Sequence, residues 1–409
     1  MLDRYQKYTL PFMEFISMMA LMMSLVALSI DAVLPAMESI GISLGVTNAN
    51  DNQHLISSLF LGLAIGQLLF GPLSDSIGRR RAMTLGYSVF FIGIILALVA
   101  NDMNTLLISR ILQGLGLAAP RVVSMAIIRD LYEGRAMARV MSFITMIFIL
   151  VPMLAPMFGQ VILTMASWQT IFIATALIGL VSLGWYLFRQ GETLAPEDRA
   201  DFTVERTAHA LKVILSNRAA LGFTIAAGLI SGPFIFYLSS AQQLFQNTYE
   251  LGQWFPLYFA GLALAIGLGS FINGKQVMKS GMRHMVEISL ILMTTTSLLF
   301  IIISWWFNGL PALWITTIYM LFTFLCMGLL FGNLNALAME PLGHIAGIGA
   351  AIVGSLSTFL AASLAIIIGQ QFNGTVYTII ISFFIAGLAN LALMKWIEYE
   401  KSPSIKIIK

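Results

Sequence analysis

The stretch Gly71-Pro-Leu-Ser-Asp75-Ser-Ile-Gly78-Arg79-Arg80-Arg81 separates two long apolar runs in a chain of 409 residues. The glycines near its two ends permit a tight turn and a close approach between helices. Asp75 and Arg79 are four residues apart, so their side chains are able to form an ion pair. The stretch therefore predicts a compact polar junction between two helices, with a cluster of arginines at its end.

Apolar runs like those beside this junction recur along the whole chain. Hydrophobic residues make up 58% of the sequence and charged residues only 10%, whereas a soluble domain carries about 25% charged residues. A helix needs roughly 20 apolar residues to cross a bilayer, and the sequence supplies such runs repeatedly. No alternation of polarity indicates a membrane β-barrel, so the predicted fold class is an all-α integral membrane protein.

Twelve apolar segments are long enough to be transmembrane helices. We expect them at residues 12–35, 54–72, 82–100, 105–128, 139–163, 168–188, 219–242, 253–274, 285–306, 311–338, 347–370 and 375–396. One long polar interval, residues 189–218, leaves six segments on either side. We therefore expect two six-helix bundles, residues 1–188 and 219–409, joined by a hydrophilic linker, as in internally duplicated transporters.

The basic residues predict how these helices are oriented in the membrane. All but two of the 22 Lys and Arg residues lie in the two tails, in the linker or in the junctions after even-numbered segments. Under the positive-inside rule such regions are cytoplasmic. We therefore expect both termini in the cytoplasm and an uncleaved first helix rather than a secretion signal. The net charge of +3 follows from this topology and does not indicate a nucleic-acid partner.

The junction resembles the signature loop of the major facilitator superfamily, Gly-x-Leu-x-Asp-x-x-Gly-Arg-Arg/Lys. In that family the Asp lies against the start of helix 11, where the positive helix end attracts it, and the loop holds the cytoplasmic side shut. Gly347 and Gly349 open the eleventh segment and would allow this contact. The second-half equivalent, Gly269–Lys275, is a degenerate junction. The resemblance implies a conformational latch of Gly71, Asp75, Gly78, Arg79, Arg80 and Asp130, in which Asp130 is the second acidic partner of Arg79.

Two ionisable residues inside predicted helices are candidates for proton coupling. The run Arg110-Ile-Leu-Gln113-Gly114-Leu-Gly116 resembles the membrane-embedded arginine motif of the same family, and a charge within a membrane is costly and usually functional. Asp31 lies at a similar depth, roughly one turn away at about 1.5 Å per residue. We expect Asp31 to bind the transported proton and Arg110, its expected partner, to tune that binding. The alternative is a static ion pair that holds two helices together.

The run Val151-Pro152-Met-Leu-Ala155-Pro156-Met-Phe-Gly159-Gln160 is rich in residues that bend a membrane helix and thin its surface. It resembles the antiporter signature Gly-x-x-x-Gly-Pro-x-x-Gly-Gly, with Ala155 and Gln160 in place of glycines. The pattern is similar to the bicyclomycin/chloramphenicol-resistance branch of the drug:proton antiporters. The antiporter residues implied by this resemblance are Pro152, Pro156 and Gly159.

Arg121 is a second cation inside a predicted helix, three turns from Arg110 and on the same helix face. Two interpretations stay open: Arg121 binds an anionic group of the substrate, or it extends toward the cytoplasm beside Asp130. The other candidate substrate contacts are polar or aromatic, a lining that suits flat lipophilic ligands. They are Gln113, Phe234, Tyr237, Tyr258 and Asn335.

The resemblance implies a proton-coupled multidrug antiporter, which exports small amphipathic compounds by alternating access and confers antibiotic resistance. It also implies a monomer in the bacterial inner membrane, with the substrate, protons and the bilayer as partners and the proton gradient in place of a cofactor. Alternatives are a dedicated exporter of an endogenous anionic metabolite such as a siderophore, an uptake symporter, or a membrane receptor. The chain has no phosphate-binding Gly-x-x-x-x-Gly-Lys-Ser/Thr loop and no metal-ligand spacing. We therefore expect neither an ATP-driven pump nor an enzyme, and no metal site.

Overall fold

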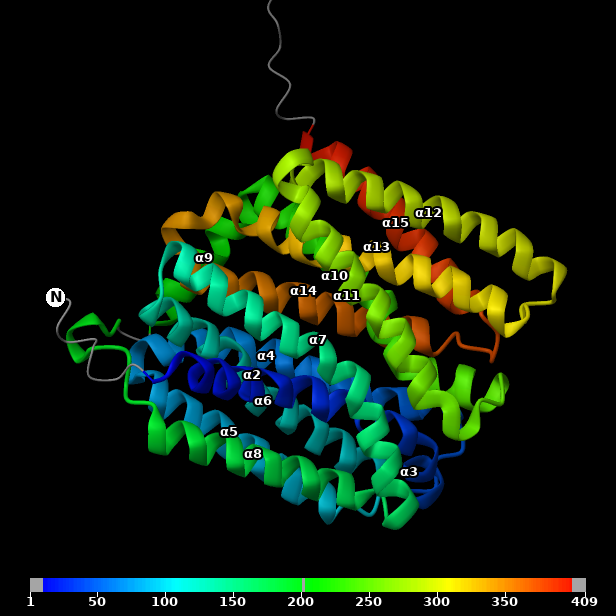
Figure 1. Cartoon of the computed structure of the whole chain (residues 1–409), viewed down its shortest axis with the longest axis horizontal. Helices are drawn as coiled ribbons and strands as arrows, with labels where there is room; N and C mark the ends of the chain where they lie inside the picture. The colour runs from blue at the N-terminus through cyan, green and yellow to red at the C-terminus, as the bar shows by residue number, and fades with distance from the viewer. Residues whose placement is uncertain (1–9, 201–202, 399–409) are drawn as a thin grey trace, which may run out of the picture.

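The structure, a computed structural model, describes residues 10–200 and 203–398, and every regular element in these ranges is helical (Figure 1). Several basic residues on which the predicted orientation depends lie outside the described residues. They are Arg4, Lys7, Lys401, Lys406 and Lys409.

The first part of the chain forms long helices joined by short connections. Their bounds are α2 Phe12–Asp31, α3 Met37–Ser43, α4 His54–Ile77, α5 Arg79–Leu98, α6 Met103–Leu131, α7 Gly134–Met165 and α8 Gln169–Arg189. Short 3-10 helices, Leu34–Ala36 and Ala49–Gln53, connect α2, α3 and α4.

The predicted linker carries one helix, and the second part of the chain again consists of long helices. The bounds are α9 Val204–Ser216, α10 Arg218–Ala241, α11 Phe255–Ser280, α12 Met282–Trp306, α13 Leu313–Met339, α14 Ala346–Gly369 and α15 Tyr377–Glu398. A π-helix, Gln242–Thr248, extends α10.

In the described part of the chain, 11 helices are long and apolar enough to cross a membrane. The remaining predicted segment, 139–163, corresponds to α7, of which Leu150–Met165 forms a shorter apolar helix. Large apolar side chains, such as Ile95, Leu180 and Ile302, are exposed along these helices, as expected where lipid is the solvent. The predicted all-helical membrane class is therefore confirmed, with 11 to 12 membrane-capable helices.

Glycines allow helices within each part to approach closely. A Cβ atom on Gly114 of α6 would overlap the carbonyl oxygen of Leu59 in α4. In the second part, a Cβ atom on Gly269 of α11 would overlap the carbonyl oxygen of Leu325 in α13. Without a hydrophobic driving force in lipid, such close backbone packing is a main source of helix association.

Helix pairs α4–α14 and α7–α11 join the two parts of the chain, and Figure 1 shows α14 lying beside α4. Midway along the first pair, Ser355 Oγ donates to the Ala64 carbonyl at 2.7 Å. At one end of α4, Gln53 donates to Gln243 at 2.7 Å. The two parts are therefore in contact along much of the length of α4.

Basic residues gather at one end of the bundle, which we call the basic end. Arg80 at the start of α5 donates to the Leu187 carbonyl near the end of α8 at 2.7 Å. Arg218 at the start of α10 donates to the Trp396 carbonyl near the end of α15. Helix ends that carry arginines thus lie together, on the left in Figure 1 with α9.

Two segments that we predicted as junctions are helical. Residues 71–77 continue α4, so that only Gly78 separates α4 from α5, with a φ of +95° that favours glycine. Likewise, Gly269–Lys275 lies inside α11 rather than in a connection. The reason is that polar and small residues indicate where a helix leaves the apolar layer, but its backbone hydrogen bonds continue beyond that point.

Candidate functional site

Arg79, at the start of α5, is the centre of a charge network at the basic end. Its Nε and Nη2 atoms lie 2.9 and 3.2 Å from the carboxylate oxygens of Asp130, and Nη1 donates to Ser74 Oγ at 2.9 Å. Asp75, four residues earlier, also pairs with Arg79. Both ion pairs expected from the sequence are present, and the two-pronged contact with Asp130 is a strong, geometrically specific type.

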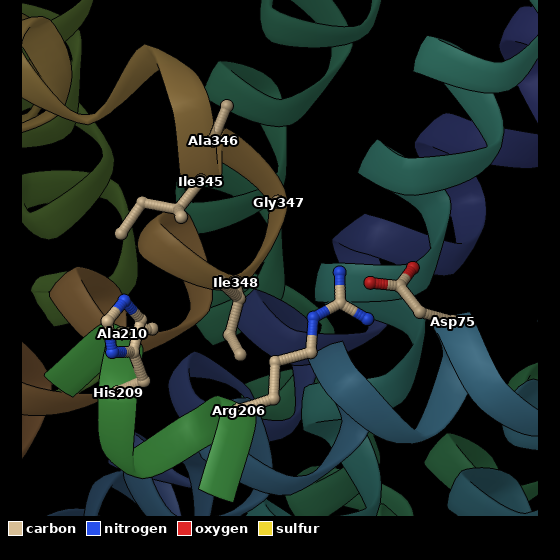
Figure 2. Close-up of a pocket in the computed structure, with 8 residues that line it drawn as sticks. All are labelled: Asp75, Arg206, His209, Ala210, Ile345, Ala346, Gly347 and Ile348. Atoms are coloured by element: carbon tan, nitrogen blue, oxygen red, sulfur yellow. The ribbon is translucent and has the colours of Figure 1, made fainter. Parts of the chain in front are cut away.

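The network reaches the start of α14, as the family resemblance implied. A Cβ atom on Gly347 would lie 3.9 Å from Asp75 Oδ2 and 3.7 Å from Arg129 Nη2. Beside them is a cavity of about 190 Å³, also lined by Arg206 and His209 of α9. Figure 2 shows Arg206 reaching from α9 toward Asp75, so the linker helix closes one side of the junction.

The linker residue Glu192 takes part in this network, which the sequence did not indicate. Its carboxylate accepts hydrogen bonds from the backbone N–H groups of Arg79 and Arg80 at 2.9 and 3.1 Å. A negative charge at this position caps the first turn of α5 and complements its helix dipole. Next to it, Thr193 Oγ1 donates to Asp130 at 2.9 Å. The linker therefore stabilises the junction through contacts with the start of α5 and with Asp130.

Replacing Glu192 by Ala is expected to destabilise the protein by about 1–2 kcal/mol, because the first-turn N–H groups of α5 lose their acceptor. Heating the purified protein in detergent and following intrinsic fluorescence would measure this as a lower unfolding temperature. Glu287→Ala is the matched control, since Glu287 is an exposed carboxylate on α12. Equal unfolding temperatures for the two variants would contradict the capping role.

Arg110 is fully buried in α6 and joins three helices by hydrogen bonds. Its Nη2 donates to the Ser29 carbonyl of α2 at 3.0 Å, and its Nε to the Leu55 carbonyl of α4 at 3.1 Å. Its Nη1 donates to Gln113 Oε1 at 2.9 Å. The hydrogen bonds of the guanidinium therefore go to neutral oxygens. Gln113, a predicted substrate contact, is buried and accepts a hydrogen bond from Arg110.

Asp31, the last residue of α2, is 4% exposed, and its Oδ1 has no hydrogen-bond partner in the described residues. Within the same residues Asp31 of α2 forms no ion pair with Arg110 of α6. The expected pairing, and with it the static ion pair, is therefore wrong. The guanidinium of Arg110 donates instead to the carbonyl of Ser29, two residues before Asp31.

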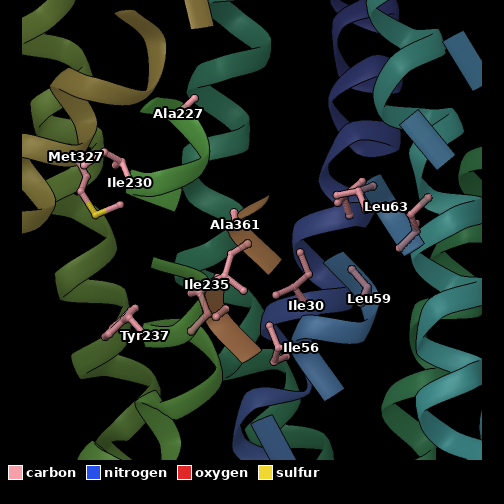
Figure 3. Close-up of a cluster of buried hydrophobic side chains, with 14 of the residues drawn as sticks. Ile30, Ile56, Leu59, Leu63, Ala227, Ile230, Ile235, Tyr237, Met327 and Ala361 are labelled. Carbon is pink, nitrogen blue, oxygen red and sulfur yellow. The ribbon is translucent and has the colours of Figure 1, made fainter. Parts of the chain in front are cut away.

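Tyr237 of α10, in the other part of the chain, is near enough to Asp31 for an electrostatic interaction. It is 1% exposed, and its hydroxyl has no hydrogen-bond partner among the described residues. Figure 3 shows Ile235 of α10 between Tyr237 and the side chains of Ile30 and Ile56, which belong to the facing helices. An unsatisfied carboxyl in the first part of the chain and an unsatisfied hydroxyl in the second part are therefore near enough to interact.

An aromatic cluster surrounds Tyr237. The ring of Tyr237 stacks on Phe234 and Phe259, with centroids 6.2 and 5.9 Å apart, and meets Phe324 edge-on at 4.7 Å. Phe245 lies 4.7 Å from the ring of Tyr258 and 6.4 Å from that of Tyr237. Of the predicted aromatic contacts, Phe234, Tyr237 and Tyr258 are therefore brought together.

Asn335 and Arg121 lie apart from this cluster. Asn335 is exposed near the end of α13 and donates to the Phe331 carbonyl at 3.0 Å. Arg121 is exposed in the second half of α6, toward the basic end. The predicted substrate residues therefore do not form one compact set.

The predicted antiporter helix is α7, which contains Pro152 and Pro156 within its length. A Cβ atom on Gly159 would overlap the carbonyl oxygen of Ala32, the residue after Asp31. Gly159 therefore lets α7 lie directly against the backbone beside the buried carboxyl.

Comparison with known proteins identifies the family of this chain. The sequence profile of the Major Facilitator Superfamily matches residues 12–366. An uncharacterized MFS-type transporter, YdgK of Bacillus subtilis, is 29% identical over 368 residues, covering 89% of this chain and 90% of that protein. The bicyclomycin resistance protein homolog of Haemophilus influenzae is 27% identical over 361 residues, 87% of this chain and 89% of its own.

Further similarity extends to another resistance protein and to solved structures. The chloramphenicol resistance protein CraA of Acinetobacter baumannii is 28% identical over 309 residues, 73% of this chain and 71% of its own. The structure of the xylose transporter XylE from E. coli has a TM-score of 0.71 at 15% identity, covering 97% of this chain and 99% of that one. That likeness concerns the fold alone. Because the profile spans most of its length, this chain belongs to the major facilitator superfamily, as a multi-pass membrane transporter, not an enzyme, related to multidrug and antibiotic-resistance efflux proteins.

Proposed function

We propose that this chain is a proton-coupled antiporter that exports small amphipathic compounds across the bacterial inner membrane. The observation that carries the proposal is the buried carboxyl of Asp31, whose Oδ1 has no hydrogen-bond partner in the described residues. A buried carboxylate without a partner is costly unless a proton or a cationic group neutralises it. Protons and substrates therefore compete at Asp31, and this competition couples their opposite fluxes.

Alternating access requires that the two ligands favour different conformations, because a ligand shifts an equilibrium only by its differential affinity. We propose that residues 1–188 and 219–409 act as two six-helix bundles that rock about this site, with both termini and the linker in the cytoplasm. The basic end is then the cytoplasmic end, and the network around Arg79 is the latch that holds it together with α14. The similarity to a bicyclomycin resistance protein homolog and to a chloramphenicol resistance protein supports export as the direction.

The aromatic cluster around Tyr237 supports amphipathic compounds as substrates. Aromatic faces bind flat apolar groups by stacking and also attract cations. The cluster contains Phe234, Phe259 and Phe324, whose ring centroids lie within 6.2 Å of that of Tyr237. Such a surface discriminates weakly among hydrophobic scaffolds, which suits an exporter of varied compounds.

Everted membrane vesicles test this function directly. Their lumen is acidified by respiration, and a pH-sensitive dye reports protons that leave when a compound is added outside. We expect chloramphenicol or a cationic dye to cause proton release that depends on the transporter. Compound transport without proton movement, or proton movement in the same direction as the compound, would contradict antiport.

A further inference from the structure

Arg121 is a cation deep within a membrane-capable helix. Between Arg121 and the end of α6 at Leu131, the helix rises about 15 Å at 1.5 Å per residue. A guanidinium at such a depth is stable only when an anionic or polar group, or water, solvates it. Arg121 therefore requires such a group close to it.

The described residues provide no partner for Arg121. It has no hydrogen bond, ion pair or aromatic contact in that part of the chain, in contrast to Arg110 on the same helix. Asp130, the partner considered from the sequence, accepts hydrogen bonds from Arg79 and Thr193 instead. The interpretation in which Arg121 extends to Asp130 is therefore not supported.

Arg121 is nevertheless accessible to solvent. Its side chain is exposed, although Arg121 lies within a membrane-capable helix. Its helix neighbours Leu117 and Ala118, on the preceding turn of the same face, are fully buried, so α6 packs against protein immediately beside Arg121. This combination suits a side chain that borders the interior of the bundle rather than lipid.

A second polar group lies beside it. Ser124, one helical turn further along α6, is fully buried, and its hydroxyl has no hydrogen-bond partner in the described residues. Ser and Thr hydroxyls within helices commonly donate to a carbonyl of the preceding turn, as Ser29 does here at 2.8 Å. Arg121 and Ser124 together thus offer unused donors on one side of α6.

We propose that Arg121, assisted by Ser124, binds a carboxylate or similar oxyanion on the transported compound. The guanidinium presents parallel N–H donors that match a carboxylate, and it keeps its positive charge at all relevant pH values. With Asp31 and the aromatic cluster nearer the other end of the membrane, the transporter takes acidic or zwitterionic amphiphiles. This inference rests on the proposed export function and specifies its substrate class.

Binding measured on the purified full-length protein tests the inference, with pairs of compounds that differ only in a free or an esterified carboxyl group. The pairs are norfloxacin and its methyl ester, and rhodamine 19 and its ethyl ester, rhodamine 6G. We expect the wild type to bind each acid more tightly than its ester. Arg121→Gln should weaken binding of the acids about tenfold or more and leave the esters unchanged, and Arg121→Lys should retain part of the preference.

The matched control is Arg139→Gln, which removes another exposed arginine, one that lies over the ring of Phe12 on α2. It should leave all four affinities unchanged. Equal losses for acid and ester in Arg121→Gln would indicate a structural role and overturn the proposal, as would a wild type without preference for either acid. Binding needs no proton gradient, so acids that bind through Arg121 without releasing protons from vesicles would refute antiport but not this site.

Discussion

Replacing Asp31 by Asn is expected to reduce substrate-driven proton release from everted vesicles to the level of vesicles without the transporter. Asn has nearly the same shape as Asp but cannot take up and release a proton in this range. It is also neutral, so it avoids the cost of a buried carboxylate, and the variant should fold at least as well as the wild type. The dye assay described above measures the release for each compound.

The control for this experiment is Asp51→Asn, which makes the same change in the 3-10 helix Ala49–Gln53. We expect it to release protons as the wild type does. Binding of an uncharged compound should persist in Asp31→Asn, because the aromatic cluster around Tyr237 is unchanged. Normal proton release by Asp31→Asn would mean that the coupling carboxyl lies elsewhere in the chain.

The membrane fold could be predicted because its main determinants are local. Each span is a continuous apolar run, and the Asp75–Arg79 pair follows from four-residue spacing on one helix. The pairing of Arg79 with Asp130 was available only from the family motif, since those residues belong to different helices. Prediction and structure therefore agree where the interacting residues belong to one helix or to one known motif.

The site was harder to predict because it depends on how helices are rotated and packed. Depth along the membrane placed Asp31 near Arg110, but depth leaves the direction of each side chain open, and Arg110 bonds to backbone carbonyls instead. Glu192 was missed because the residue it caps lies 113 positions away and no motif marks the contact. Tyr237 was predicted as an aromatic contact, but nothing in the sequence placed it near Asp31.

Replacing Gly159 by Leu is expected to abolish transport and to lower the unfolding temperature of the purified protein. A Cβ atom there would overlap the carbonyl oxygen of Ala32, and backbone cannot move aside as a flexible side chain does. Overpacking in a well-packed interior typically costs about 1–3 kcal/mol, and a backbone contact belongs at the upper end of that range. Vesicle transport and fluorescence-detected unfolding measure the two effects.

Gly184→Leu separates this effect from the general consequence of placing Leu in a membrane helix. A Cβ atom on Gly184 of α8 would meet no atom within 4 Å, so this variant should transport and unfold like the wild type. Normal transport by Gly159→Leu would show that α7 need not approach Ala32 for function. Loss of transport with Gly184→Leu unaffected would instead link the predicted antiporter helix to Asp31 physically, because Gly159 brings α7 against the backbone beside the proposed coupling carboxyl.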